Sequence, residues 1–338
     1  MEVVHPCCCG VDVHKASVVA CLLTPGAGGG TTKEVRTFGT MTQDLLALSD
    51  WLVAANCPAV AMESTASFWK PLYTLLEGVI PTLLVVNAAH IKQVPGRKTD
   101  VKDAEWIADL LRHGLLRASF IPDRDQRELR ELTRYRVSLI QERSREVNRV
   151  QKTLEGGNIK LSVGAKDLTG VSARAMLAAL LEDRLDAAAM AQLARGKLRA
   201  KIPQLKQALV GLMGPHQRAM IAWQLGHIDD LDALVAAVSA DITARLRPFA
   251  LQAAQVDTVT GIGPVTAETI IAEVGVDMTR FPDADHLTAW AGLAPSSNES
   301  AGKRRRAKTR KGSPALRAIL VEAAQAAGRS KDTYLGAL

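Results

Sequence analysis

The sequence predicts an α/β domain with a mixed sheet at the N-terminus, followed by a mostly α-helical middle and C-terminal part. As far as residue 122, short apolar runs of strand length alternate with segments of helical periodicity. From residue 123 onward the periodic segments have helical spacing and are separated by Gly or Pro. With 338 residues, of which 47% are hydrophobic, the chain is long enough for two or three domains with cores of their own.

In the first part, strands are predicted where apolar runs end at turn residues, and helices where apolar residues recur every three or four positions. The predicted strands are residues 7–14, 17–23, 34–39, 59–62 and 81–86. The predicted helices are residues 42–55, 68–76 and 100–116, the last with Thr99 as its N-cap. Three early strands followed by alternating helices and strands indicate a mixed sheet in a domain that spans residues 1–122.

The middle region, 123–250, begins with a stretch rich in Arg and Glu that ends at Gly156 and Gly157. Its apolar residues have helical spacing, which predicts one long exposed helix over 124–152. A coiled coil that dimerises the protein and a helix that packs on its own domain are both compatible with this pattern. The rest of the region is rich in Ala and Leu and predicts further helices, with breaks at Pro203 and Pro248.

The third region, 251–338, opens with "VDTVTGIGPVTAETIIAEVG". Gly261 and Gly263 permit a tight turn between two helices, which is the form of a helix-hairpin-helix. The amides at the start of the second helix then offer a contact for a phosphate of a nucleic-acid backbone. An ordinary helix–helix turn is the alternative. A further helix is predicted over 284–291, and the last one begins at Pro314.

Composition narrows the class of function. The formal net charge is +7, and seven bases fall within nine residues, which indicates a polyanionic partner. The five cysteines lack the spacing of a zinc site and are expected to be reduced, apolar strand residues. No run of 18 apolar residues and no secretion signal are present, so we expect a cytoplasmic protein without a membrane span.

Four carboxylates form the first candidate site. Asp12 lies inside an apolar strand, Glu63 ends another strand, and Asp100 and Asp103 share a face in the first turn of a helix. Strand ends and a helix start can converge at one edge of a sheet, and clustered carboxylates repel one another unless a cation lies among them. Oxygen ligands suit Mg²⁺ or Mn²⁺, which can catalyse phosphoryl transfer. Taken singly, each acid other than Asp12 is also compatible with a structural role.

A loop in the third region carries the second candidate site. Ser296, Ser297 and Ser300 precede the basic run, and a serine hydroxyl beside a bound phosphodiester can attack phosphorus. A solvated basic face is the alternative for the run. Its residues are Lys303, Arg304, Arg305, Arg306, Lys308, Arg310 and Lys311.

Three segments resemble the motifs of the insertion sequence 110 family of transposases. They are "GVDVHK", "AMESTASFWKPLYTLLE" and "VVNAAHIKQVPGRKTDVKDAEWIADLL". The resemblance implies a RuvC-like domain with an RNase H fold, in which Asp12, Glu63, Asp100 and Asp103 form a metal-binding tetrad. "GLAPSSNESAGKRRR" is similar to the C-terminal motif of the family, whose nucleophilic serine corresponds to Ser300. Because Ala301 stands between Ser300 and Gly302, Ser297 is the second candidate for the nucleophile.

The family resemblance also implies partners. It implies a bacterial, nucleoid-associated recombinase that cuts and rejoins double-stranded DNA at element ends and targets. A structured non-coding guide (bridge) RNA would select the DNA, and a homo-oligomer would combine the tetrad of one subunit with the serine of another. The residues alone leave two alternatives open, a RuvC-like nuclease that uses water and a nucleic-acid-binding protein with a vestigial tetrad. Because family members usually continue beyond "SKDTYLGAL", we expect a C-terminally truncated chain.

Overall fold

The structure is a computed structural model of the 338-residue chain. It describes all residues except Met1, Ala27, Thr65, 88–101, Arg184, 296–298, 301–302, 305–308, 310–311 and Leu338, together with the side chains of Lys102, Glu299, Ser300, Lys303 and Arg304. The chain divides into two compact units, Met1–Pro122 and Asp123–Leu338, and each is described by itself.

The first unit contains a five-stranded mixed sheet with the order β3-β2-β1-β4-β5. β1 pairs antiparallel with β2 and parallel with β4, β2 pairs antiparallel with β3, and β4 pairs parallel with β5. The predicted mixed sheet is therefore confirmed. The elements are β1 Cys8–Val13, β2 Val18–Pro25, β3 Thr31–Phe38, α1 Thr42–Ala54, β4 Ala59–Glu63, α2 Trp69–Leu76, β5 Thr82–Val86 and α4 Lys102–Arg112.

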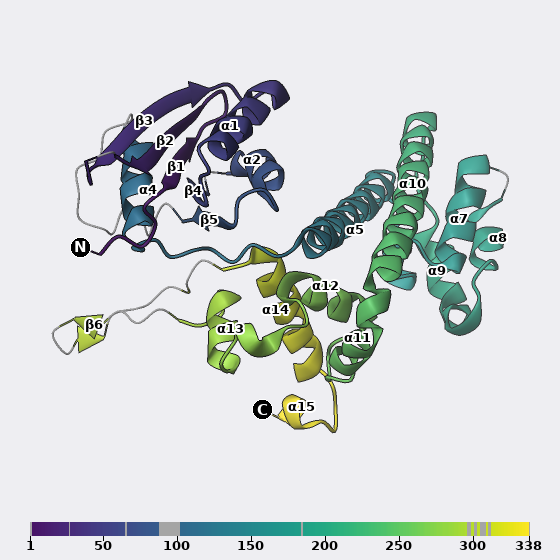
Figure 1. Ribbon diagram of the computed structural model, residues 1–338. Helices are drawn as coiled ribbons and strands as arrows, with labels where there is room; N and C mark the ends of the chain where they lie inside the picture. The colour runs from purple at the N-terminus through teal and green to yellow at the C-terminus, as the bar shows by residue number, and fades with distance from the viewer. Residues whose placement is uncertain are drawn as a thin grey trace. The chain divides into compact units, whose positions relative to one another are not determined.

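Side-chain alternation along the central strands divides the core of this unit into two layers. Cys9, Val11 and Val13 of β1 belong to the cluster that α1 and α2 cover. Cys8, by contrast, belongs to the cluster that includes Ala104 and other residues of α4, on the opposite face of the sheet (Figure 1). The sheet is consequently covered on both faces, which explains why the central strands are apolar on both sides.

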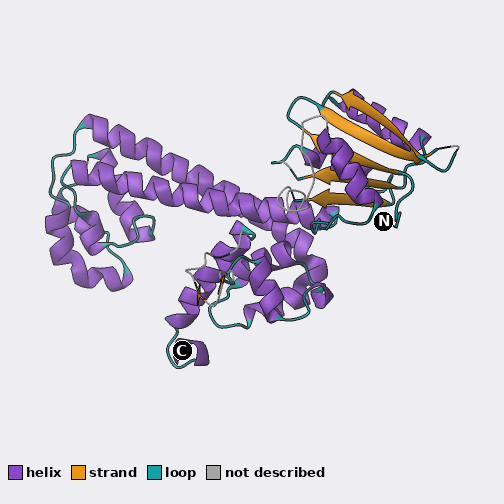
Figure 2. Ribbon diagram, turned by 90° about the vertical axis from the view of Figure 1, so that its left-hand side faces the viewer, coloured by secondary structure: helices purple, strands orange, loops and turns teal. Residues whose placement is uncertain are grey.

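Two long helices that lie side by side dominate the second unit (Figure 2). They are α5 Arg124–Gly156 and α10 Pro215–Leu246. Val150 and Leu154 near the end of α5 share a core with Ile221 and Leu225 of α10. The predicted long helix is present, and it packs against a helix of its own chain.

Short helices complete both ends of this pair. Between α5 and α10 lie α6 Leu161–Gly164, α7 Val171–Glu182, α8 Ala187–Ala191, the 3₁₀ helix η1 Gly196–Lys201 and α9 Ile202–Ala208. After α10 follow η2 Arg247–Phe249, α11 Ala250–Asp257, α12 Pro264–Val274, η3 Met278–Arg280, α13 Ala284–Trp290, β6 Glu299–Ser300, β7 Lys303–Arg304, α14 Pro314–Gly328 and α15 Tyr334–Ala337. Leu129 of α5, Ile242 of α10 and Ile271 of α12 share one hydrophobic cluster, which crosses the predicted boundary at residue 250.

The cysteines are free, as expected, and they lie within the first unit. Cys8, Cys9, Cys21 and Cys57 are buried, and Cys7 is half-buried. Among the described residues, no helix combines the length and the apolar character needed to cross a bilayer.

Candidate functional site

Asp12 is buried near the end of the central strand β1, with 5% of its surface exposed. Its carboxylate oxygen Oδ2 lies 3.0 Å from Nε2 of His14, whose side chain is 57% exposed. A buried carboxylate is costly unless a partner stabilises its charge. The His14 contact supplies one such partner from the adjoining turn.

Glu63 lies level with Asp12 on the neighbouring strand. Val11 of β1 pairs with Met62 of the parallel strand β4. The next residue is Asp12 on β1 and Glu63 on β4, so these two acids lie at the same level. By alternation, both side chains belong to the face opposite the Val11 and Met62 side chains, which is the face that α4 covers. The strand register therefore gives Asp12 and Glu63 a common face and a common edge.

Gly10 brings α4 against the same face of the sheet. A Cβ at Gly10 would lie 2.2 Å from the backbone nitrogen of Ala108 and 2.3 Å from the carbonyl oxygen of Ala104. Further back on β1, Cys8 Sγ lies 3.6 Å from the carbonyl oxygen of Ala108. Progress along β1 from Cys8 to Asp12 thus leads toward the first turn of α4, where Asp103 lies.

The structure places three of the four predicted acids on elements that meet at one edge of the sheet. Asp100 lies outside the described residues. Within the described part of the chain, no group of three or more His, Cys, Asp or Glu side chains is arranged to hold a metal ion. The four-carboxylate metal site therefore remains a prediction, supported by strand register and helix packing.

The Gly-Ile-Gly turn lies between α11 and α12, as predicted, and its two glycines differ. Gly261 has a φ of +89°, and a Cβ there would lie 2.4 Å from the carbonyl oxygen of Ala323 in α14. Gly263 precedes α12 with an extended backbone, and a Cβ there would meet nothing within 4 Å. Gly261 is thus required for helix packing, and the open position is Gly263. The phosphate-binding role of the turn remains a prediction.

The predicted nucleophile and part of the basic run lie in a short hairpin. Ser300 of β6 pairs with Lys303 of β7, and Glu299 pairs with Arg304. Ser296, Ser297, Arg305, Arg306, Lys308, Arg310 and Lys311 lie outside the described residues.

The base of this loop is held closely. Pro295 forms an isolated antiparallel bridge with Thr309. A Cβ at Gly312 would lie 2.3 Å from the backbone nitrogen of Gly292, so the two ends of the segment approach at van der Waals distance only because Gly312 lacks a side chain. The described residues at the two ends of the segment that carries Ser300 therefore lie side by side.

A buried ionic cluster fixes the end of the same segment. Glu273 of α12 is fully buried and accepts hydrogen bonds from Arg134 Nε at 2.7 Å and from Ser313 Oγ at 3.0 Å. Ser313 is the N-cap of α14 and follows the basic loop directly. Arg130 of α5 donates to the carbonyl oxygens of Ala272 and Glu273. Burial lowers the pKa of Arg130 to about 10, the nearby Glu273 charge opposing that shift.

Sequence reasoning missed the residues that position the candidate sites. Ser313 before Pro314 has the signature of an N-cap, so this residue was readable from the sequence. Glu273 and Arg134 are far apart in the chain, and no local pattern indicates that they meet. Likewise, nothing in "GVDVHK" reveals that Gly10 contacts a helix almost one hundred residues later, at Ala104 and Ala108.

Both ends of the chain match family models that describe transposases. Residues 9–159 match a model of IS110-type transposases of the DEDD class. Residues 253–336 match the model of the transposase IS116/IS110/IS902 family. The fold and the two candidate sites thus lie in a protein of the transposase class. The chain belongs to the IS116/IS110/IS902 family of transposases.

Two relatives come from insertion elements of Streptomyces. The chain is 29% identical over 293 residues to a 44.8 kDa protein of the insertion element IS116 from Streptomyces clavuligerus, covering 75% of this chain and 71% of the relative. It is 29% identical over 226 residues to a 43.6 kDa protein of the insertion element IS110 from Streptomyces coelicolor, covering 61% of this chain and 55% of the relative.

Solved structures of Thermus thermophilus RuvC show a distant likeness. The free protein matches with a TM-score of 0.25 and 12% identity, over 33% of this chain and 99% of RuvC. RuvC in complex with a Holliday junction substrate matches with a TM-score of 0.24 over the same shares.

Proposed function

We propose that this transposase cuts and rejoins DNA through a carboxylate site in the first unit and a serine nucleophile in the second. The observation that carries the proposal is the register of β1 and β4, which puts Asp12 and Glu63 at one edge, beside the start of α4. Burying a carboxylate in a central strand costs free energy that an apolar residue would not cost. A catalytic role accounts for its presence.

The donor set fits a hard divalent cation. Asp12, Glu63, Asp100 and Asp103 offer only oxygen ligands, and one of them is 5% exposed at a sheet edge. Mg²⁺, or Mn²⁺ in its place, is the cofactor that these ligands prefer. When bound, the ion supplies activation of a hydroxyl and stabilisation of the leaving oxygen. The contact with His14 orients the carboxylate of Asp12.

Ser300 is the proposed nucleophile, with Ser297 as the second candidate. Its Oγ forms a bond to phosphorus while one phosphorus–oxygen bond to deoxyribose breaks. The serine proton passes to a carboxylate of the acidic site and from there to the sugar oxygen that leaves, so that protons and charge balance. Rejoining reverses these steps with a second DNA hydroxyl. The bases from Lys303 to Lys311 hold the phosphates, and Gly261 and Gly263 add a backbone contact.

The proposed partners are duplex DNA and a structured guide RNA that pairs with it. A protein that reads backbone and shape rather than bases needs many Arg and Lys and few aromatic residues, and this chain has 42 of the former and 4% of the latter. We propose that a homo-oligomer brings the carboxylate site of one subunit to the serine of another, and that the protein acts at the nucleoid.

Separate variants test the two sites on supercoiled DNA that carries the element ends, with the guide RNA present. Asp12→Asn is expected to abolish strand cleavage in Mg²⁺ and to weaken Mn²⁺ binding measured by electron paramagnetic resonance. Asp50→Asn, an exposed acid on α1, is the matched control and should retain both. Full cleavage by Asp12→Asn would overturn the carboxylate site.

Ser300→Ala is expected to abolish a protein–DNA adduct that survives denaturation. Ser297→Ala should leave that adduct intact. Cleavage by Ser300→Ala with no adduct in the wild type would identify a nuclease that uses water. DNA binding by the wild type without any cleavage would identify a vestigial tetrad.

A further inference from the structure

A second basic surface lies far along the chain from the predicted basic run. Residues 187–228 contain no Asp or Glu. This stretch covers α8, η1, α9 and the start of α10. Its bases are Arg195, Lys197, Arg199, Lys201, Lys206 and Arg218. Four of them fall within or directly before the single element η1, and neither the carboxylate site nor the serine loop uses them.

The η1 helix divides its residues between a cavity and solvent. A 3₁₀ helix has three residues per turn, so Arg195, Leu198 and Lys201 follow one side. All three line a cavity of about 490 Å³, and the opposite wall is formed by residues 164–173. Lys197 and Arg199 are exposed on the other sides of η1. The element thus presents positive charge both at the cavity mouth and beyond it.

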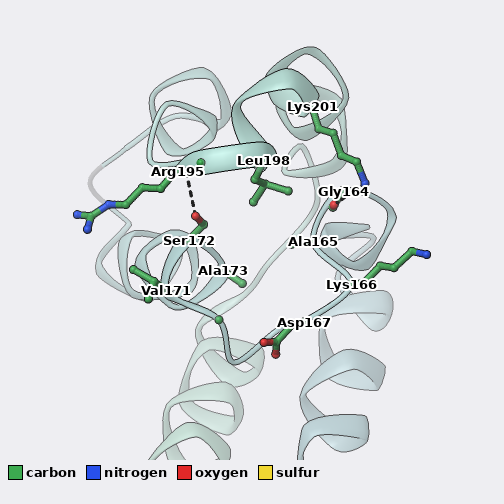
Figure 3. A pocket seen from close by; sticks show the side chains of 12 residues that line it. Gly164, Ala165, Lys166, Asp167, Val171, Ser172, Ala173, Arg195, Leu198 and Lys201 are labelled. Atoms are coloured by element: carbon green, nitrogen blue, oxygen red, sulfur yellow. Dashed lines mark hydrogen bonds between the residues drawn. The ribbon is translucent and has the colours of Figure 1, made fainter. Parts of the chain in front are cut away.

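Figure 3 shows how the charged side chains lie around this cavity. The side chains of Arg195 and Lys166 extend away from the cavity on opposite sides of it. Lys201 Nζ donates to the carbonyl oxygen of Gly164 at 3.1 Å, and the backbone nitrogen of Arg195 donates to Ser172 Oγ at 2.9 Å. These two bonds join the walls, whose outer edge, here called the rim, carries Lys166 on one side and Arg195 on the other.

The charges on this rim lack the acidic partners that other arginines in the same unit have. Arg143 pairs with Asp232, Arg174 with Asp229 and Arg218 with Asp183. Among the described residues, by contrast, Lys166, Arg195, Lys197 and Arg199 form no ion pair. One carboxylate, Asp167, lies in the cavity lining and accepts hydrogen bonds from Thr169 at 2.9 and 2.7 Å. The positive charge of the rim is therefore not neutralised within the unit.

We propose that Lys166, Arg195, Lys197 and Arg199, here called the tip patch, bind the phosphodiester backbone of a nucleic-acid duplex. Residues 160–210 contain no Phe, Tyr or Trp, so the surface offers no platform on which unpaired bases stack. The exposed Lys and Arg side chains, which have no acidic partners in the described part of the unit, instead match regularly spaced phosphates. The first residues of α7 line the same cavity and add the positive end of a helix dipole.

This inference rests on the proposed function only in that the ligand is a nucleic acid. The tip patch is a contact surface on the short helices between α5 and α10, and it is separate from the residues proposed to carry out cleavage. Duplex DNA and a duplex stem of a guide RNA present the same phosphate chemistry, and the experiment distinguishes them.

The test measures equilibrium binding in the cleavage-deficient Asp12→Asn background, so that binding is read without catalysis. The tip variant combines the three substitutions Arg195→Gln, Lys197→Gln and Arg199→Gln. It is compared with a control variant that removes three bases from α5. The control is Arg124→Gln, Arg145→Gln, Lys152→Gln; all three are exposed, none forms an ion pair among the described residues, and the charge change is the same. Fluorescence anisotropy is recorded with a duplex DNA and with a duplex RNA between 50 and 300 mM salt.

The tip variant is expected to bind one of the two duplexes about tenfold more weakly, or more, near physiological salt. The slope of log K against log salt should become shallower by about 2.7 for DNA, since each phosphate contact contributes about 0.9. The α5 control should keep the wild-type affinity and slope. Lys166→Gln, which removes one base from the opposite wall of the cavity, should make the slope shallower by about 0.9, the contribution of one phosphate contact.

Equal weakening by both triple variants would overturn the tip patch, because it would show a general charge effect. Unchanged binding of both duplexes by the tip variant would also overturn it, and so would absence of duplex binding in the Asp12→Asn parent. Circular dichroism confirms that the exposed substitutions leave the fold intact. Full cleavage by the Asp12→Asn parent, together with weaker duplex binding by the tip variant, would overturn the proposed carboxylate site and leave the tip patch supported.

Discussion

Gly10 in β1 is the position where a single methyl group should disrupt both the fold and the carboxylate site. A Cβ there would lie 2.2, 2.3 and 2.8 Å from three backbone atoms of Ala108 and Ala104. Ordinary carbon contacts are near 3.5–4.0 Å, so in Gly10→Ala the helix α4 must move away from the sheet by more than about 1 Å. Neither a central strand nor a helix backbone can give way as a flexible side chain does.

The cost follows from this geometry. Overpacking of a core costs about 1–3 kcal/mol, and the backbone contacts here place Gly10→Ala near about 3 kcal/mol. The movement also displaces the first turn of α4, which carries Asp103, relative to β1, and a misplacement of about 1 Å in the proposed site can reduce a catalytic rate about 100-fold. We therefore expect a large fall in metal-dependent strand cleavage together with a loss of stability that is confined to the first unit.

Hydrogen exchange measured by mass spectrometry on the full chain separates the two units. In Gly10→Ala, amides of β1 and α4 should exchange about 100-fold faster, the equivalent of about 3 kcal/mol. Peptides from α5 and α10 should be unchanged. Gly28→Ala is the matched control, because a Cβ at Gly28 meets nothing within 4 Å. Protection in Gly10→Ala within about 1 kcal/mol of the control would refute the packing of α4 on Gly10.

Three further predictions concern other parts of the molecule. Glu273→Gln should lower the free energy of unfolding by about 2 kcal/mol in urea titrations, because the charge-assisted bonds from Arg134 weaken while Ser313 keeps its partner; a loss under about 0.5 kcal/mol would contradict this reasoning. Gly261→Ala should lower the thermal midpoint much more than Gly263→Ala, which changes only the N-cap of α12, because only the former places a Cβ against α14 at a positive φ. The stability of the first unit should hold up to about pH 9 and fall above it, because the thiols of the unfolded chain ionise near their ordinary pKa of 9.0 while the buried thiols of the folded chain stay neutral. Equal hydrogen-exchange free energies at pH 8 and 10.5 would contradict this. Burial raises the thiol pKa to about 11 for Cys21 and to about 12 for Cys8 and Cys57.

The first unit was the more predictable of the two. Its apolar runs have the length of strands and end close to turn residues. The predicted and observed strands therefore agree within a few residues. The mixed order of the sheet followed from three early strands and the later alternation with helices. The common face of Asp12 and Glu63 became visible only with the structure, because the parallel pairing of β1 and β4 sets their register.

The second unit was less predictable, because its helices acquire partners from distant segments. The Arg and Glu pattern of α5 left open whether its apolar side meets a second chain or its own. In the structure, Val150 and Leu154 pack with α10 of the same chain. The pairing of Glu273 with Arg134 joins residues 139 positions apart, and only tertiary structure brings them together. The Lys and Arg residues of η1 can be read from the sequence, but only the structure shows that they have no acidic partners among the described residues.

The tripeptide Gly10-Val11-Asp12 links the fold of the first unit to its candidate chemistry. Val11 faces the α1 and α2 side of the sheet and anchors the strand in that core. Gly10 and Asp12 face the other side, where the missing side chain of the first lets α4 approach, and the carboxylate of the second lies two residues further along the strand toward the helix start. A larger residue at position 10 would preserve the acid and remove its neighbour. If the proposed site is correct, Gly10 is therefore as necessary to it as Asp12, although the glycine contributes no ligand.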